Sequence, residues 1–153
     1  MKLFLNNLLK NTQSIPGFEN LEAAKDYLCR YLLSYIHIEL SSLPKQEWEK
    51  TLKTWAKICM FANSLLQKSE EERQELYRKY NFDQMMIGIA EDVRHTLIGA
   101  YALGLLKKED KPYKIIPLAA SFALEDNKLM EKHQFNREIL EYIKGLFDEG
   151  RSV

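Results

Sequence analysis

The sequence has 153 residues, of which 46% are hydrophobic and 29% are charged, as in an ordinary globular protein. Its 22 basic residues match its 22 acidic residues, so the formal net charge is zero. That balance disfavours a dedicated DNA or RNA binder, which usually carries a basic surplus, although it does not exclude nucleic acid. A chain of this length can bury a core without disulfides or a structural metal. We therefore expect one domain over residues 1–153.

The cysteines and the apolar segments indicate a cytoplasmic protein. Cys29 and Cys59 are too few for a disulfide framework, and their apolar neighbours predict buried, unreactive thiols. The apolar run that follows Lys2 is interrupted at once by Asn6 and Asn7, so it does not read as a signal peptide. The longest apolar stretch, 27–43, contains charged side chains and is not a membrane span.

The first half of the chain shows three helical patterns in succession. Apolar residues in 2–12 predict a short amphipathic helix that ends before Pro16 and Gly17. Asn20 is placed to cap a second helix, which runs to about 42 and is apolar almost all round, as in a central buried helix. Pro44 marks the start of a third helix that runs to about 68.

The second half continues in the same way. Ser69 and Glu72 have the form of a capping box and predict a fourth helix, which ends near 80. Three more helices are expected: one capped by Asp83 and ending near 108, one over 117–123, and one from 126 or 127 to about 149. Gly150 would end the last of them. The sequence therefore predicts an all-α, single-domain helical bundle of six to seven helices.

Arg30 and His37 lie seven positions apart on the second predicted helix, a spacing that keeps two residues on one face of an α-helix. This pair resembles the Arg…His motif of HEPN ribonucleases, which are also helical. The resemblance implies a metal-independent ribonuclease in which His37 acts as general acid or base and Arg30 stabilises charge at the phosphate. Alternatively, these residues form the polar edge of a buried helix together with Asp26, Ser34 and Ser41.

Asp92 and His95 lie three positions apart on the fifth predicted helix, where a carboxylate and a histidine can share a metal, as in di-iron bundles. Such bundles need a second pair with further carboxylates, and the sequence offers none. We therefore expect Asp92 and His95 to join Glu91 and Arg94 in a solvated or salt-bridged patch. We predict no metal and no cofactor.

Aromatic and small residues carry the remaining signals. Trp48 and Trp55 lie on one heptad stripe, which is typical of a core but could instead anchor a partner, because tryptophan is enriched at binding hot spots. An apolar pocket between helices could be lined by Tyr27, Tyr31, Tyr35 and Tyr101. Three glycines in the fifth helix, each costing up to about 1 kcal/mol relative to alanine, predict a close packing contact: Gly88, Gly99 and Gly104.

These patterns favour a protein that binds other proteins over an enzyme. No Gly-rich phosphate loop and no Ser-His-Asp arrangement can be picked out. Apolar and aromatic helix surface, by contrast, is plentiful for a chain of this size. We expect a non-enzymatic helical interaction protein, an adaptor, regulator or small assembly subunit that forms a homodimer. A HEPN-like ribonuclease and a small-molecule carrier with the tyrosine-lined pocket remain alternatives.

Overall fold

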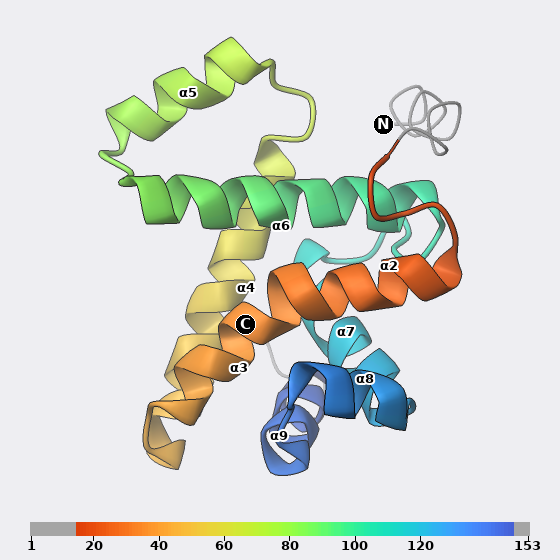
Figure 1. The fold of residues 1–153 in the computed structure, drawn as a ribbon. Helices are drawn as coiled ribbons and strands as arrows, with labels where there is room; N and C mark the ends of the chain where they lie inside the picture. Colours follow the sequence, from red (N-terminus) through yellow and green to blue (C-terminus); the bar gives the residue numbers. More distant parts are fainter. Residues whose placement is uncertain (1–14, 149–153) are drawn as a thin grey trace.

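Residues 15–148 are described by a computed structural model, drawn in Figure 1. Over these residues the chain is helical without strands, so the predicted all-α class is confirmed. The same residues form seven helices when the continuous helical segment 21–41 is counted as one helix. The helix predicted at 2–12 and the stop predicted at Gly150 lie outside the described residues. Among the described helices, none combines the length and apolar character that crossing a bilayer requires.

The α-helices are α2 (Leu21–Leu28), α3 (Ser34–Ser41), α4 (Trp48–Ser64), α5 (Glu70–Lys79), α6 (Gln84–Ala102), α7 (Ile115–Leu124), α8 (Asn127–His133) and α9 (Arg137–Asp148). Shorter turns join some of them: a π-helical turn η2 (Cys29–Leu33) between α2 and α3, and the 3-10 turns η3 (Lys45–Glu47) and η4 (Pro112–Lys114) before α4 and α7.

Three predicted helix caps are confirmed. The side-chain oxygen of Asn20 accepts the backbone N–H of Ala23 at 2.8 Å at the start of α2. Ser69 and Glu72 form the reciprocal capping box of α5. The Asp83 carboxylate accepts the backbone N–H of Met86 at 2.8 Å at the start of α6. Each cap satisfies a backbone donor that the first helical turn leaves unpaired, so local sequence chemistry determines where these helices begin.

The second predicted helix contains a π turn that its apolar pattern did not reveal. The backbone N–H and the hydroxyl of Ser34 both donate to the carbonyl oxygen of Cys29, five residues earlier, the hydroxyl at 2.7 Å. A π turn carries one residue more than an α turn. The side chains of α3 are therefore rotated by roughly 100°, the angle per residue of an α-helix, relative to those of α2.

Two predicted helix ends are corrected. α6 ends at Ala102 instead of near 108, because Gly104 adopts a φ of 75° and the N–H of Leu105 bonds back to Ala100. The last predicted helix is two helices, α8 and α9, because Gln134 takes a left-handed φ of 55° between them. The chain turns there, so that α9 packs against α7.

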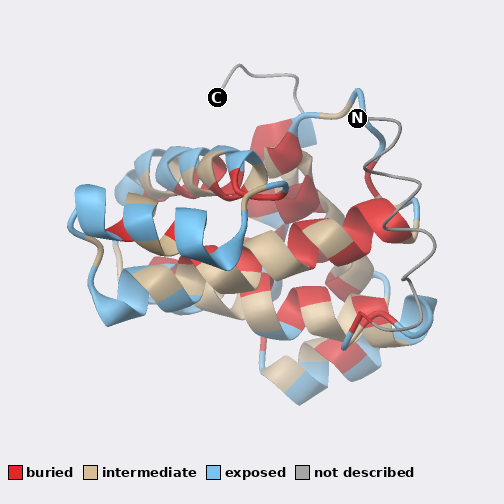
Figure 2. Ribbon diagram, turned by 90° about the horizontal axis from the view of Figure 1, so that it is seen from above, coloured by how far each residue is buried: buried red, intermediate tan, exposed pale blue. Residues whose placement is uncertain are grey.

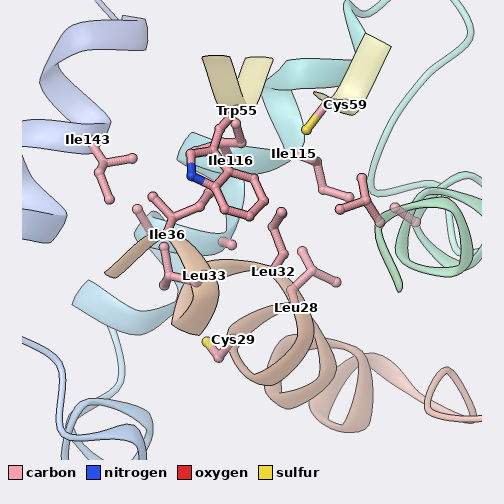
Figure 3. Close-up of a cluster of buried hydrophobic side chains, with 14 of the residues drawn as sticks. Leu28, Cys29, Leu32, Leu33, Ile36, Trp55, Cys59, Ile115, Ile116 and Ile143 are labelled. Carbon is pink, nitrogen blue, oxygen red and sulfur yellow. The ribbon is translucent and has the colours of Figure 1, made fainter. Parts of the chain in front are cut away.

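The hydrophobic core lies where α2, η2 and α3 meet α4, α7 and α9. Figure 3 shows the Trp55 ring of α4 among Leu32, Ile36 and Ile116. Figure 2 shows the buried positions gathered along the inward sides of the helices. A second, smaller cluster joins α5 to α4 and α6; it consists of Leu65, Tyr77 and Ala90, with Phe61, Leu76, Phe82 and Ile87 against it. The helix α5 therefore packs outside the main core.

Candidate functional site

An apolar groove lies on the surface between α4 and α6, beside the turn that joins α5 to α6. Its cavity has a volume of about 210 Å³. The lining residues are Thr54, Lys57, Ile58, Phe61, Phe82, Met86, Ile89 and Ala90. Those of α4 follow the spacing i, i+3, i+4 and i+7, so they share one face of the helix. The groove is thus made by one stripe from each of two crossing helices.

The end of the groove is held by the turn between α5 and α6. Asn81 takes a positive φ of 56°, which an asparagine accepts more readily than most residues. The backbone N–H of Phe82 then donates to the carbonyl oxygen of Tyr77 at 2.9 Å. The Phe82 ring stacks on Tyr77 and lies 5.4 Å from the ring of Phe61. Backbone and ring contacts together position Phe82 as one wall of the groove.

Large apolar side chains remain exposed around the groove. Met86 is 45% exposed and its neighbour Met85 is 74% exposed, both in the first turn of α6. Tyr80, at the end of α5, is 55% exposed. Single exposed apolar residues are common, but a cluster beside an apolar groove is typical of a binding surface. Methionine suits such a surface, because its flexible thioether adapts to different partners.

Charged side chains of both signs lie on α4 and α5 around this groove. Exposed lysines project from α4: Lys50, Lys53 and Lys57. Exposed glutamates project from α5: Glu70, Glu71 and Glu75. Figure 1 shows α5 along one side of α6, while α4 descends on the other side. Lys53 pairs with Glu49 at 3.2 Å, whereas Lys57 has no ion pair with any residue of 15–148. Exposed basic residues, Arg78 and Lys79, also lie in the last turn of α5, next to the turn that closes the groove, so this surface carries both signs of charge.

Arg30 and His37 do not form a site together. The π turn between them changes the helix phase, so the expectation that they share a face is corrected. Arg30 lies beside Asp26, with Nε 3.9 Å from the carboxylate. His37 instead accepts the backbone N–H of Asn136 at 2.8 Å, and burial lowers the pKa of its imidazole. Ribonuclease activity stays a prediction.

The metal candidates Asp92 and His95 point to separate partners. Asp92 accepts the hydroxyl proton of Tyr35 at 2.5 Å, while Nε2 of His95 lies 2.8 Å from the carbonyl oxygen of Pro16. Within residues 15–148, no group of three or more histidines, cysteines and carboxylates is arranged to hold a metal ion. Asp92 and His95 are therefore used inside the fold, where they tie α6 to α3 and to the segment before α2.

The four tyrosines divide between two places. Tyr27 and Tyr31 have ring centroids 4.3 Å apart, and Tyr35 is bonded to Asp92 nearby on α3. This hydrogen bond raises the pKa of Tyr35 to about 12. Tyr101 lies elsewhere, on α6 against α4, with its hydroxyl 3.3 Å from the side chain of Asn63. The structure therefore does not gather all four around one pocket.

Both tryptophans pack inside the chain. Trp48 and Trp55 are 7% and 5% exposed. The indole N–H of Trp48 donates to the carbonyl oxygen of Leu40 at 2.9 Å, and that of Trp55 donates to the carboxylate of Glu39 at 2.7 Å. Their stripe is thus part of the core, the first of the two readings that their spacing allowed, and the exposed apolar surface is on a different face of α4.

Both cysteine thiols are buried, and burial raises the pKa of each to about 12.

Sequence patterns missed the groove itself, because the residues that build it come from two helices and the turn between α5 and α6. The one available signal was the pair Met85 and Met86 at the start of a helix, an exposed apolar position next to a capping residue.

A second, larger hollow of about 410 Å³ lies between α2 and α8, where most of the lining residues are charged. Two of them form an ion pair, Asp26 with Lys132 at 2.9 Å, and Asp26 also lies 3.0 Å from His133. It joins two parts of the fold, whereas the groove between α4 and α6 leaves its apolar surface uncovered.

Comparison with known proteins shows similarity in sequence to an uncharacterized protein. An uncharacterized protein of Aquifex aeolicus (strain VF5) is 49% identical over 144 residues, which are 94% of this chain and 95% of that protein. No protein-family model matches the chain, and no solved structure matches it. The likeness therefore extends over nearly the full length of both chains.

Proposed function

The chain belongs to the family of this Aquifex aeolicus protein, and we propose that it acts as a homodimeric helical interaction protein whose two copies associate through the groove between α4 and α6. The observation that carries the proposal is the groove with its exposed rim of Met85, Met86 and Tyr80. Covering such a surface releases water from apolar side chains, which is the main driving force of association.

The charges around the groove favour a second copy as the occupant. In a twofold dimer both copies contribute the same surface, so that residue i of one copy contacts residue j of the other while j contacts i. A twofold axis through the groove would bring the glutamates of α5 in one copy toward the lysines of α4 in its partner. The same axis brings the protruding Met85 and Met86 of one copy toward the groove of the other. A surface that carries both glutamates and lysines can place opposite charges against each other in such a dimer.

Sedimentation velocity over a range of protein concentrations tests the proposal. We expect the wild-type chain to sediment as a dimer, and Met85→Glu with Met86→Glu to sediment as a monomer. Acidic residues are well tolerated in the first turn of a helix, so these changes leave α6 intact. The matched control is Leu21→Glu, an apolar residue that is 49% exposed in the first turn of α2.

Two results would contradict the proposal: a wild-type chain that is monomeric at all concentrations, or a dimer that survives both methionine substitutions.

The salt dependence of the dimer tests the charge argument separately, because added salt screens attraction between exposed charges. The dimer dissociation constant should therefore rise with salt in the wild-type chain. Lys57→Glu should weaken the dimer at low salt and reduce that dependence.

A further inference from the structure

The helix α5 contributes little to the hydrophobic core. Of its ten residues, only Leu76 and Tyr77 are apolar, and both pack in the small cluster with Leu65 and Ala90. Figure 1 shows α5 at the edge of the molecule, on the far side of α6 from α7, α8 and α9. Segments with few buried apolar contacts can open while the rest of a protein stays folded. The position of α5 therefore depends on a small number of specific contacts.

One carboxylate of α6 accepts three hydrogen bonds from α5. The guanidinium of Arg73 donates to both oxygens of Glu91, at 2.9 and 3.1 Å, and the hydroxyl of Tyr77 donates to the same carboxylate at 2.5 Å. Arg73 also donates to the carbonyl oxygen of Lys68 at 3.0 Å. Arg73 and Tyr77 are both buried and lie four positions apart, on one face of α5. Because hydrogen bonds to a charged acceptor are the stronger ones, Glu91 is a strong polar contact between the two helices.

Tyr77 also positions one wall of the groove between α4 and α6. The Phe82 ring stacks on the Tyr77 ring with the centroids 5.5 Å apart, and the backbone N–H of Phe82 donates to the carbonyl oxygen of Tyr77. If α5 separates from α6, Tyr77 no longer holds Phe82 beside Phe61, and the groove loses this wall. The complete groove therefore requires α5 in its docked position.

We propose that α5 separates from α6 as a unit while the rest of the chain stays folded, and that Glu91 controls this opening. Glu91 is a positioning residue, because it does not line the groove but holds the helix whose Tyr77 positions Phe82. The effect on association rests on the proposed dimer: a second copy needs the complete groove and binds only the form with α5 docked. A partner that binds one of two conformations shifts the population toward it. Dimer formation should thus keep α5 docked.

Hydrogen exchange followed by mass spectrometry, at a protein concentration where the chain is monomeric, tests the opening. After correction for intrinsic rates, we expect the amides of α5 to exchange faster than those of α4 and α7. Ile143→Val removes one carbon from the main core and should speed exchange of the most protected amides of α4 and α7 by about two- to tenfold. The same substitution should leave the exchange of α5 unchanged, because α5 opens without the main core.

Two glutamate substitutions test the role of Glu91. Glu91→Gln should speed the exchange of α5 by about tenfold or more, since hydrogen bonds to a charged acceptor are lost. The matched control is Glu75→Gln, at an exposed position of α5, which should leave the exchange of α5 unchanged. Three results would each overturn the proposed opening: equal protection of α5 and α4, faster exchange of α5 in Ile143→Val, or no effect of Glu91→Gln.

The same measurement over a range of protein concentrations tests the link to association. Exchange of α5 should slow as the wild-type dimer forms, and it should not depend on concentration in the chain with Met85→Glu and Met86→Glu. A dimer that leaves the exchange of α5 unchanged would overturn the link, while the proposed function stands. A chain that never dimerises would refute the proposed function together with the link, whereas the opening of α5 is still measured in the monomer.

Discussion

Replacing Gly99 with alanine tests how tightly α6 packs against the segment that precedes α2. A Cβ atom at Gly99 would lie 2.3 to 2.4 Å from three atoms of the Phe18 ring, far inside van der Waals contact. Phe18 cannot easily move, because it is fully buried and its ring packs against those of Tyr27 and His95. Of the two glycines in α6, Gly99 is therefore the one at which the fold leaves no room for a side chain.

The matched control is Gly88→Ala in the same helix, where an added Cβ meets no atom within 4 Å. Alanine stabilises a helix by up to about 1 kcal/mol relative to glycine, and this gain applies at both positions. Overpacking costs typically about 1–3 kcal/mol and applies only at Gly99. The two variants should therefore differ by about 1–3 kcal/mol in free energy of unfolding, with Gly88→Ala above the wild-type chain.

Urea unfolding followed by circular dichroism, at one protein concentration, measures this difference. For a chain of this length each kcal/mol corresponds to about 2–4 °C in Tm, so thermal unfolding gives an independent check. In a Phe18→Ala background the steric conflict is gone, and Gly99→Ala should then be stabilising. The reasoning fails if Gly99→Ala is as stable as Gly88→Ala in the wild-type background.

Two further predictions follow from the ion pairs and from His37 of α3, which contacts the segment before α9. Glu91→Ala leaves Arg73 with 10% of its side chain exposed and without a carboxylate, so we expect a loss of about 2–4 kcal/mol in urea unfolding. Glu138→Ala breaks an ion pair with more than half of each side chain exposed and should cost under about 1 kcal/mol; equal losses would contradict this reading. Because the pKa of His37 is lowered below its ordinary value of 6.5, its contribution is present above pH 6.5 and is lost as the pH falls below it. The unfolding free energy should therefore decline from about pH 7 to pH 5 more steeply in the wild-type chain than in His37→Gln, and parallel profiles would refute the contact with Asn136.

The helix starts could be predicted because the groups that decide them are neighbours in sequence. Asn20, Ser69 and Asp83 each bond a backbone N–H three residues ahead, so a short segment contains both partners. The all-α class follows for the same reason, since apolar residues recur at helical spacing. The buried stripe of Trp48 and Trp55 was likewise one of the two outcomes that its heptad spacing allowed.

The break at Gln134 goes with a contact between distant segments, whereas the π turn has local hydrogen bonds from Ser34 to Cys29 that the apolar pattern did not reveal. The local sequence alone would equally allow a regular α-helix to continue through residues 29–33 and 134–136. In the folded chain, the N–H of Asn136 instead bonds the imidazole of His37, 99 positions away in sequence. The π turn in turn rotates α3, so the face shared by Arg30 and His37 in a regular α-helix is lost.

The groove was equally beyond the reach of sequence patterns. The groove exists because α4 and α6 cross and the Phe82 ring closes one end, which no single helix reveals. The sequence alone determined the helices and most of their caps, whose hydrogen bonds are local. The tertiary structure decided which apolar side chains line the groove, because that depends on residues brought together from different helices.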